Sequence, residues 1–159
     1  MKAKSIKGKS AEEIQSALEK SLADGFKPTL ALVFISVKRD ISSIMRLLSD
    51  KDIQIFGATT GGEISDSDIS HQGISVLLLD MNPANFRVLY EDYAGKKVAE
   101  VAKTMTEQAL TIFSRPAFLL SNSIDKPQDI GLGEKILLSV SQVAGNNGTI
   151  WGGAAGDDL

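Results

Sequence analysis

Residues 30–35 read Leu-Ala-Leu-Val-Phe-Ile, an unbroken apolar run that follows Pro28. Such a run, flanked by a turn-forming residue, predicts a β-strand that is covered on both faces. A second apolar run, Ile-Ser-Val-Leu-Leu-Leu at residues 74–79, predicts another strand of the same kind. The two runs place the chain among proteins whose sheet is packed against helices.

Helical patterns surround these strands. Ser10 and Glu13 stand three residues apart and form a capping box, which predicts a helix that begins at this point. Asp40 is a candidate N-cap for a second helix, because apolar residues follow it at helical spacing. The same spacing predicts two further helices, over about residues 96–113 and 129–144.

Shorter strands are expected near residues 53–56, 117–120 and 149–151. Residues 86–90 alternate apolar with other side chains after the turn Asn82-Pro83-Ala84-Asn85, which predicts an antiparallel hairpin with residues 74–79. Helices and strands therefore alternate along the chain. The predicted fold class is α/β, a mixed β-sheet with an internal antiparallel hairpin and helices packed on the sheet.

The length of 159 residues fits one domain. Residues 1–9 contain four lysines separated by small residues and are expected to form a flexible N-terminal tail. Residues 10–159 are then expected to form a single α/β domain. No internal repeat and no linker is evident in the sequence.

Composition excludes several classes of function. The net charge is −3, and no basic patch is evident, so no nucleic-acid partner is expected. The absence of cysteine removes thiolate nucleophiles, disulfides and cysteine metal sites. No apolar run approaches the roughly 20 residues of a membrane helix, and residues 1–10 lack the apolar centre of a secretory signal. A soluble, cytoplasmic protein without membrane insertion is expected.

Two glycine-rich segments each follow a predicted strand. They read Gly-Ala-Thr-Thr-Gly-Gly-Glu at residues 57–63 and Gly-Gly-Ala-Ala-Gly-Asp-Asp at residues 152–158. In α/β sheets ligands collect beyond the C-terminal ends of strands, where glycine lets backbone N–H groups approach them. The alternative interpretation is that the glycines only permit tight turns.

At these two segments the chain resembles the N-terminal domain of the FIST family, the sensory domains of bacterial signal-transduction proteins. The family carries Gly-x-Ser/Thr-Thr-x-Gly-Glu, here residues 57–63, and later Gly-Gly-x-Ala-Gly-Asp, here residues 152–157. The resemblance extends from about residue 30 to residue 159. It implies a small-ligand sensor, with amino acids as proposed ligands, and it marks as ligand-binding residues Thr59, Thr60, Gly61, Gly62, Glu63, Gly152, Gly153, Gly156 and Asp157.

The resemblance also implies partners. Family sensors continue past the second motif into more of the domain and then a C-terminal FIST domain, whereas this sequence ends at Leu159. The chain is therefore expected to be a truncated domain that works with a signalling output domain or a C-terminal FIST domain. An uncovered sheet would favour association of the fragment as a two-fold homodimer.

The main hypothesis is a non-enzymatic sensor of a small polar ligand. Backbone N–H groups of the two glycine segments would hold a carboxylate, while Thr59, Thr60, Glu63 and Asp157 would orient the rest of the ligand. Glu63 serves equally well as a clamp on its own loop. The alternatives are a protein-interaction module without a ligand and, less favoured, an enzyme that uses Glu63 and Asp157 as acid and base.

No cofactor and no metal ion are expected. Some FIST-like proteins bind haem, and His71 is the only imidazole that could be a ligand here, but it is interpreted as a surface loop histidine. Asp157 and Asp158 are adjacent, so their carboxylates tend to point apart rather than share a cation. Trp151 is expected in the core.

Overall fold

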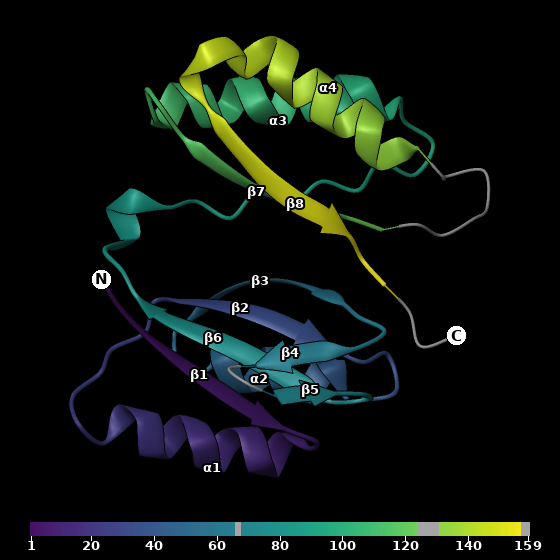
Figure 1. Ribbon diagram of the computed structural model, residues 1–159. Coiled ribbons are helices and arrows are strands. Elements are labelled where there is room, and N and C mark those ends of the chain that lie inside the picture. Colours follow the sequence, from purple (N-terminus) through teal and green to yellow (C-terminus); the bar gives the residue numbers. More distant parts are fainter. Residues whose placement is uncertain (66–67, 124–130, 157–159) are drawn as a thin grey trace. The chain divides into compact units, whose positions relative to one another are not determined.

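The computed structural model describes residues 1–65, 68–123 and 131–156 (Figure 1). Contacts between backbone segments divide the chain into two compact units. The N-terminal unit comprises Met1–Val88 together with Gly156, and the C-terminal unit comprises Leu89–Ala155. Each unit is described by itself. The assignment of residues 10–159 to one domain stays a prediction.

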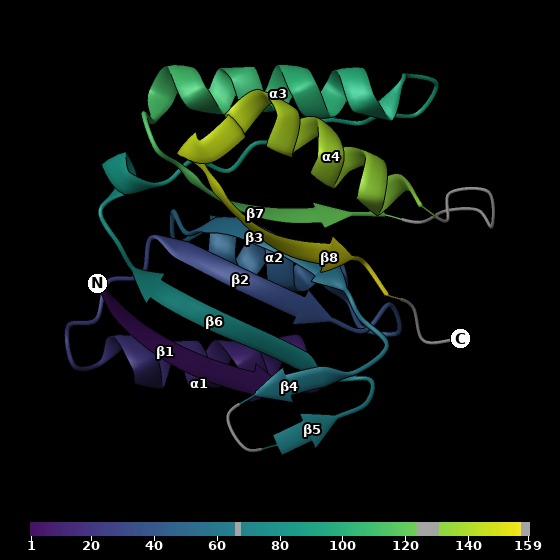
Figure 2. The ribbon, with the colours of Figure 1, turned by 45° about the horizontal axis from the view of Figure 1, so that its top comes forward.

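The N-terminal unit is built on a mixed four-stranded sheet with the order β1-β6-β2-β3. Strands β2 (Leu30–Ile35) and β3 (Gln54–Thr59) are parallel, and helix α2 (Ile41–Ser49) connects them. Strand β6 (Ile74–Asp80) is antiparallel to β2 and to β1 (Lys2–Gly8), which is followed by helix α1 (Ala11–Leu22). Figure 2 shows the four strands side by side.

One face of this sheet carries the hydrophobic core. Ile6, Val33 and Val76 lie opposite one another on neighbouring strands and are buried. They pack with fully buried side chains of both helices, namely Ile14, Leu18, Ile44 and Leu48. The other face is less covered, because Phe34 and Leu77 remain 39% and 37% exposed. The predicted coverage of both faces therefore holds only for the helix side.

Both predicted helix caps of this unit are confirmed. The Ser10 hydroxyl accepts the Glu13 N–H at 3.3 Å, while the Glu13 carboxylate accepts the N–H of Lys9 at 2.8 Å. The Asp40 carboxylate accepts the Ser43 N–H at 3.0 Å at the start of α2. Local side-chain chemistry therefore places the helix starts where the sequence predicted them.

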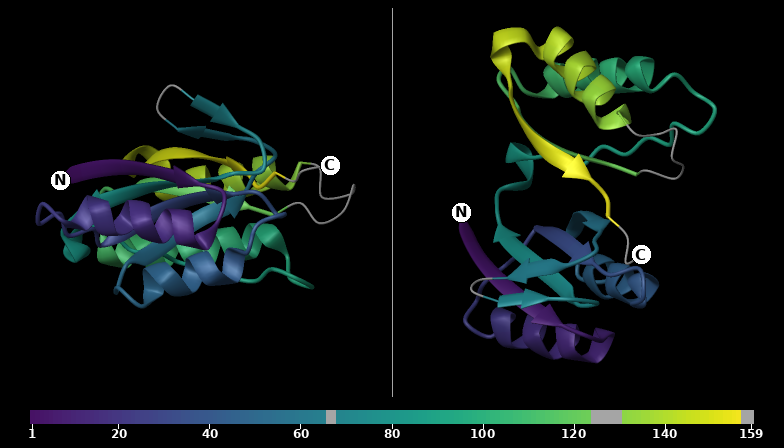
Figure 3. Two further views of the ribbon diagram at one scale, coloured as in Figure 1. Left: turned by 90° about the horizontal axis from the view of Figure 1, so that it is seen from below. Right: turned by 45° about the vertical axis from the view of Figure 1, so that its right-hand side comes forward.

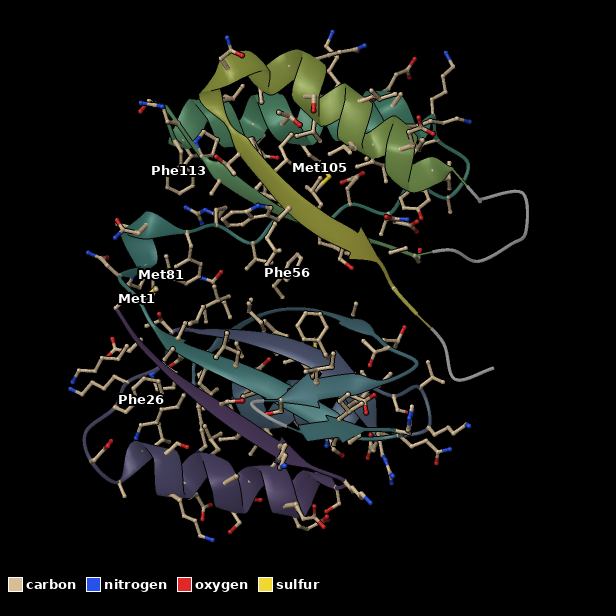
Figure 4. The ribbon with its side chains drawn as sticks, viewed as in Figure 1. Met1, Phe26, Phe56, Met81, Met105 and Phe113 are labelled. Atoms are coloured by element: carbon tan, nitrogen blue, oxygen red, sulfur yellow. The ribbon has the colours of Figure 1, made fainter. Side chains whose placement is uncertain are left out.

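The prediction of a flexible N-terminal tail is wrong, because residues 2–8 form β1 and pair along their whole length with β6. Lys4 fixes the strand further: its ammonium group lies 2.8 Å from the Asp24 carboxylate and 5.0 Å from the centre of the Phe26 ring. Phe26 is labelled in Figure 4 and lies on the α1 side of the sheet. A partner roughly 70 residues away along the chain, rather than local composition, makes this segment a strand.

The predicted hairpin between residues 74–79 and 86–90 is also wrong. Strands β1 and β2 occupy both edges of β6, so residues 86–90 have no place beside it and form no strand. The turn before them is a short 3-10 helix, η1 (Pro83–Asn85). The internal antiparallel hairpin is instead formed by β4 (Glu63–Ser65) and β5 (Asp68–Ser70), between β3 and β6.

The C-terminal unit contains the parallel pair β7 (Ala117–Asn122) and β8 (Thr149–Ala154), connected by α4 (Leu132–Ala144) and the 3-10 helix η3 (Gly145–Asn147). Helix α3 (Val98–Ile112) packs against α4, and both helices lie on the same side of the two strands (Figures 1 and 3). The mixed α/β fold class predicted from the sequence is confirmed.

Several apolar side chains of this unit are not buried. Leu137 of α4 is 46% exposed, and Trp151, which was expected in the core, is 67% exposed. Trp151 lies opposite Leu119 in β7, which is 43% exposed, whereas the neighbouring Phe118 is half-buried and reaches the start of β8 at Gly148. Because side chains alternate along a strand, Trp151 takes the face that the helices do not cover.

None of the helices in the described part of the chain is long and apolar enough to cross a membrane.

Candidate functional site

Gly156 of the second glycine segment lies at the C-terminal end of β3, within the N-terminal unit. The Thr60 N–H donates to the carbonyl of Ile35 at 3.0 Å, which ends the pairing of β3 with β2. The Thr59 carbonyl then accepts the N–H of Gly156 at 2.8 Å. A residue near the end of the chain is thus bound to the first glycine segment, almost 100 positions earlier in the sequence.

Gly156 leaves little room for a side chain at this contact. A Cβ atom on residue 156 would lie 3.1 Å from the Gly61 nitrogen and 3.5 Å from the Thr60 Cα atom. Any larger residue would therefore press on the turn that follows β3. Gly156 therefore approaches the first glycine segment through its backbone.

Glu63 is the buried carboxylate of the site, with only 1% of its surface exposed. One carboxylate oxygen accepts the Thr60 hydroxyl at 2.9 Å, and the other accepts the Gly73 N–H at 2.7 Å and the Ser70 hydroxyl at 3.3 Å. These three donors join both ends of the β4–β5 hairpin to the end of β3. Within the described residues, the Glu63 carboxylate therefore holds its own loop together. Glu63 and its three donors are called the Glu63 clamp below.

Ser70 and Gly73 are members of this clamp that the sequence did not reveal. A Cβ atom on residue 73 would lie 3.0 Å from the Glu63 carboxylate and 2.6 Å from the Ser70 hydroxyl. The absence of a side chain at Gly73 therefore lets its N–H reach the buried carboxylate. A single glycine before a strand gives no signal of this role, because glycine is common in turns.

The backbone between Thr60 and Glu63 is the accessible part of the site. Gly61 and Gly62 are both exposed, and neither N–H donates a hydrogen bond to another residue of the described ranges. A Cβ atom on residue 62 would meet the His71 ring at 3.5 Å, an ordinary contact distance. Free N–H groups in a turn at a strand end are suited to binding an anion.

Gly152 and Gly153 lie within β8 of the C-terminal unit, away from a turn. Gly152 has φ 154° and faces the carbonyl of Leu120 so closely that a Cβ atom would lie 2.1 Å from that oxygen. Because Gly152 has no side chain, β8 can lie this close to β7. Gly153 has open space around it. Asp157 lies outside the described residues.

The haem and metal candidates from the sequence are not part of any group of ligand side chains in the described ranges. His71 is exposed in the turn before β6, and no group of three His, Asp or Glu side chains there is arranged to hold a metal ion. A shallow surface depression lies at the opposite end of β3 and is lined by residues that include Met45, Gln54 and Val88. It shares no residue with the glycine segments.

Comparison with known proteins identifies one family. The FIST N domain model matches residues 29–159 of the 159-residue chain. Neither the curated proteins nor the solved structures include a match to this sequence. The matched range contains both glycine segments and every residue of the Glu63 clamp.

Proposed function

This chain belongs to the FIST N domain family, a signal-transduction sensor domain, and from that premise we propose that it binds a small polar ligand at the end of β3. The ligand carries a carboxylate, and an amino acid is the proposed class. The role is sensory rather than catalytic, in a cytoplasmic signalling protein. Ligand binding is transmitted to a signalling output domain or a C-terminal FIST domain.

The convergence of the two glycine segments carries this proposal. Gly156 is bound to Thr59 at the turn that contains Gly61 and Gly62, two exposed residues. Backbone donors at the C-terminal end of a parallel strand suit a carboxylate, because they are fixed in place and carry no negative charge of their own. Thr59 and Thr60 add polar groups next to these donors.

Glu63 has a supporting part in this proposal. Three hydrogen bonds already occupy its carboxylate, so it shapes the turn instead of contacting the ligand directly. Its bond to Thr60 connects the turn to the β4–β5 hairpin. A ligand that orders Gly61 and Gly62 therefore also orders the hairpin, which gives a physical route from binding to a change at the surface.

Thermal unfolding of the whole chain with a panel of amino acids and small carboxylic acids tests the proposal. A ligand present at about 100 times its dissociation constant stabilises the fold by about 2.7 kcal/mol. Gly62→Ala is the test variant, because its methyl group would meet His71 at an ordinary distance and the chain is expected to fold. The added methyl group narrows the approach to the N–H groups and is expected to reduce the ligand-induced shift.

Gly133→Ala is the matched control. Gly133 lies in α4, where a Cβ atom would meet the Asn122 side chain at 3.4 Å, outside the proposed site. This variant is expected to keep the full ligand-induced shift. Equal loss of the shift in both variants would contradict a site at Gly62, and a panel without any shift would remove the main support for a small-ligand sensor.

A further inference from the structure

One turn of the N-terminal unit connects the glycine turn after β3 to the end of β2. It comprises residues 70–73, between β5 and β6, and is called the 70–73 turn. On one side the Gly73 N–H donates to the Glu63 carboxylate at 2.7 Å. On the other side the Gly73 carbonyl accepts the N–H of Ser36, the residue that follows β2, at 3.1 Å. The loop between β2 and α2 is therefore bound to the same turn as Glu63.

Arg39, in the loop between β2 and α2, is fixed on the 70–73 turn by one nitrogen of its guanidinium group. Its Nε–H donates to the Gln72 carbonyl, and the side chain is half-buried. The preceding residue, His71, has its ring beside Gly62, where a Cβ atom would lie 3.5 Å from the His71 Nδ1 atom. Arg39 and Gly62 thus lie against adjacent residues of one turn, and adjacent Cα atoms are about 3.8 Å apart.

The two terminal nitrogens of Arg39 are available to a ligand. Within residues 1–65, 68–123 and 131–156 they donate no hydrogen bond and form no ion pair with a carboxylate. Asp40, the next residue, has both oxygens engaged by Ser43, one by its N–H at 3.0 Å and the other by its hydroxyl at 2.6 Å. A guanidinium group held in this way presents a planar pair of NH₂ groups that fits a carboxylate and loses less side-chain entropy on binding.

The glycine turn and Arg39 are two separate anion-binding groups. Gly61 and Gly62 offer exposed backbone N–H groups, which suit one carboxylate. Arg39 offers a fixed positive charge one residue farther along the 70–73 turn, which suits a second. A ligand with a single carboxylate binds only one of the two groups, whereas a ligand with two carboxylates binds both.

The buried Glu63 carboxylate makes this cation necessary for a ligand with two acidic groups. Glu63 directly follows Gly62 and is 1% exposed, so an anion at the glycine turn already lies close to one negative charge. A second carboxylate on the ligand adds repulsion, and partly buried charges are screened only weakly by water and salt. The guanidinium group of Arg39 offsets this repulsion.

We propose that the ligand carries two carboxylates, as an acidic amino acid or a dicarboxylic acid does, and that Arg39 binds the second one. This inference rests on the proposed function, in which Gly61 and Gly62 bind the first. Arg39 then distinguishes an acid from its amide, because an amide places an NH₂ donor against the donors of the guanidinium group. Hydrogen bonds between two charged groups are also about twice as strong as neutral ones.

Isothermal titration calorimetry of the whole 159-residue chain compares each acid with its own amide: glutamate with glutamine, aspartate with asparagine, and succinate with succinamate. The wild-type chain is expected to bind the acid of at least one pair about tenfold or more tightly than the amide. Arg39→Gln is expected to remove this preference by weakening the acid alone. Arg39→Lys keeps the charge without the planar pair of donors and is expected to retain part of the preference.

Lys38→Gln is the matched control, because it removes one positive charge from the neighbouring exposed residue. This variant is expected to keep the full preference for the acid. A preference that survives in Arg39→Gln, or that Lys38→Gln removes equally, overturns the inference. Equal weakening of acid and amide in Arg39→Gln also overturns it, because Arg39 would then only hold the turn.

The same titrations separate this inference from the proposed function. Acids and amides that bind equally well to the wild-type chain overturn the role of Arg39 and leave the carboxylate site at Gly61 and Gly62 in place. Absence of binding by all six compounds contradicts the carboxylate site itself, and the role of Arg39 with it.

Discussion

The β2-α2-β3 and β7-α4-β8 elements share their register and a glycine as the fourth residue of the second strand, Gly57 and Gly152, but they differ in what surrounds them. Strands β1 and β6 extend the first element into a four-stranded sheet, and two helices bury one face of it. Within the described residues, the second element is a two-stranded pair, with Leu138 and Trp151 exposed. A local arrangement of backbone can therefore be repeated in one chain while its burial, and hence its contribution to stability, depends on neighbouring strands.

The largest expected effect compares equivalent helices. Leu48 of α2 is fully buried, so Leu48→Ala is expected to lower the free energy of unfolding by about 2–5 kcal/mol. Leu138 of α4 is 54% exposed, and Leu138→Ala is expected to change it by less than about 0.5 kcal/mol. Urea unfolding of the two variants measures the difference. Similar losses in both would show that the C-terminal unit buries its helix in solution as fully as the N-terminal unit does.

The next prediction tests the equivalence of the two strand glycines. Gly57→Ala and Gly152→Ala each force a methyl group against a carbonyl of the neighbouring strand, and each is expected to cost about 1–3 kcal/mol of unfolding free energy. Gly153→Ala is the control, because no atom lies within 4 Å of a Cβ at that position. If Gly152→Ala unfolds like Gly153→Ala, the close approach of β7 and β8 is not maintained in solution.

Glu63 provides a test that concerns the N-terminal unit alone. Glu63→Gln replaces one carboxylate oxygen by an NH₂ group, which cannot accept all three donors that the carboxylate now binds. Leaving a buried donor unpaired is expected to lower the free energy of unfolding by about 1–3 kcal/mol. Glu100→Gln, at an exposed position of α3, is the control. Unchanged stability of Glu63→Gln would argue against the clamp and return Glu63 to the group of direct ligand contacts.

The smallest effect concerns the start of the two crossover helices. Asp40 caps α2, and its bonds from the Ser43 hydroxyl and N–H hold the pKa of its carboxyl below the usual value. The described residues provide no side-chain cap for α4, which begins after Gly131. Because the folded-state pKa is the lower one, the cap contributes fully above the unfolded pKa of about 3.9, and its contribution is lost as the pH falls through the folded-state value.

Asp40→Asn separates this cap from other acid effects. Asparagine caps a helix about as well as aspartate but does not titrate. Urea unfolding is therefore expected to give similar stabilities for Asp40→Asn and the wild type at neutral pH, with the wild type losing more only below a pH of about 4. A difference between the two that opens at higher pH would contradict the lowered pKa.

Local patterns predicted the elements whose formation depends on neighbours in the sequence. Ser10 and Asp40 cap helices as expected, and the run at residues 30–35 forms β2. The segments whose predicted structure was wrong are those that depend on distant pairing partners. Residues 86–90 have the alternation of a strand but no edge to pair with, whereas residues 2–8 have little apolar character and still pair along β6.

The candidate site also has parts that the sequence predicted and parts that it did not. Composition and position after a strand pointed to the segments at residues 57–63 and 152–158, because glycine and threonine at strand ends are typical of ligand-binding turns, and the family resemblance marked Gly156 within the second. The sequence did not distinguish Gly152, whose missing side chain serves a strand contact, from Gly156, whose missing side chain serves the turn. Both are glycines in the same motif, and only their neighbours in space differ.

The sequence by itself determined the mixed α/β class, the starts of α1 and α2 and the family, because these depend on periodicity, caps and motifs within short stretches of chain. Only the tertiary structure decided that Glu63 clamps its loop, since its donors come from Thr60, Ser70 and Gly73 through folding of the hairpin. It also decided that β6 pairs with β1 and β2. Strand pairing joins residues far apart in the sequence, and a backbone hydrogen bond leaves no mark on the side chains that a pattern could detect.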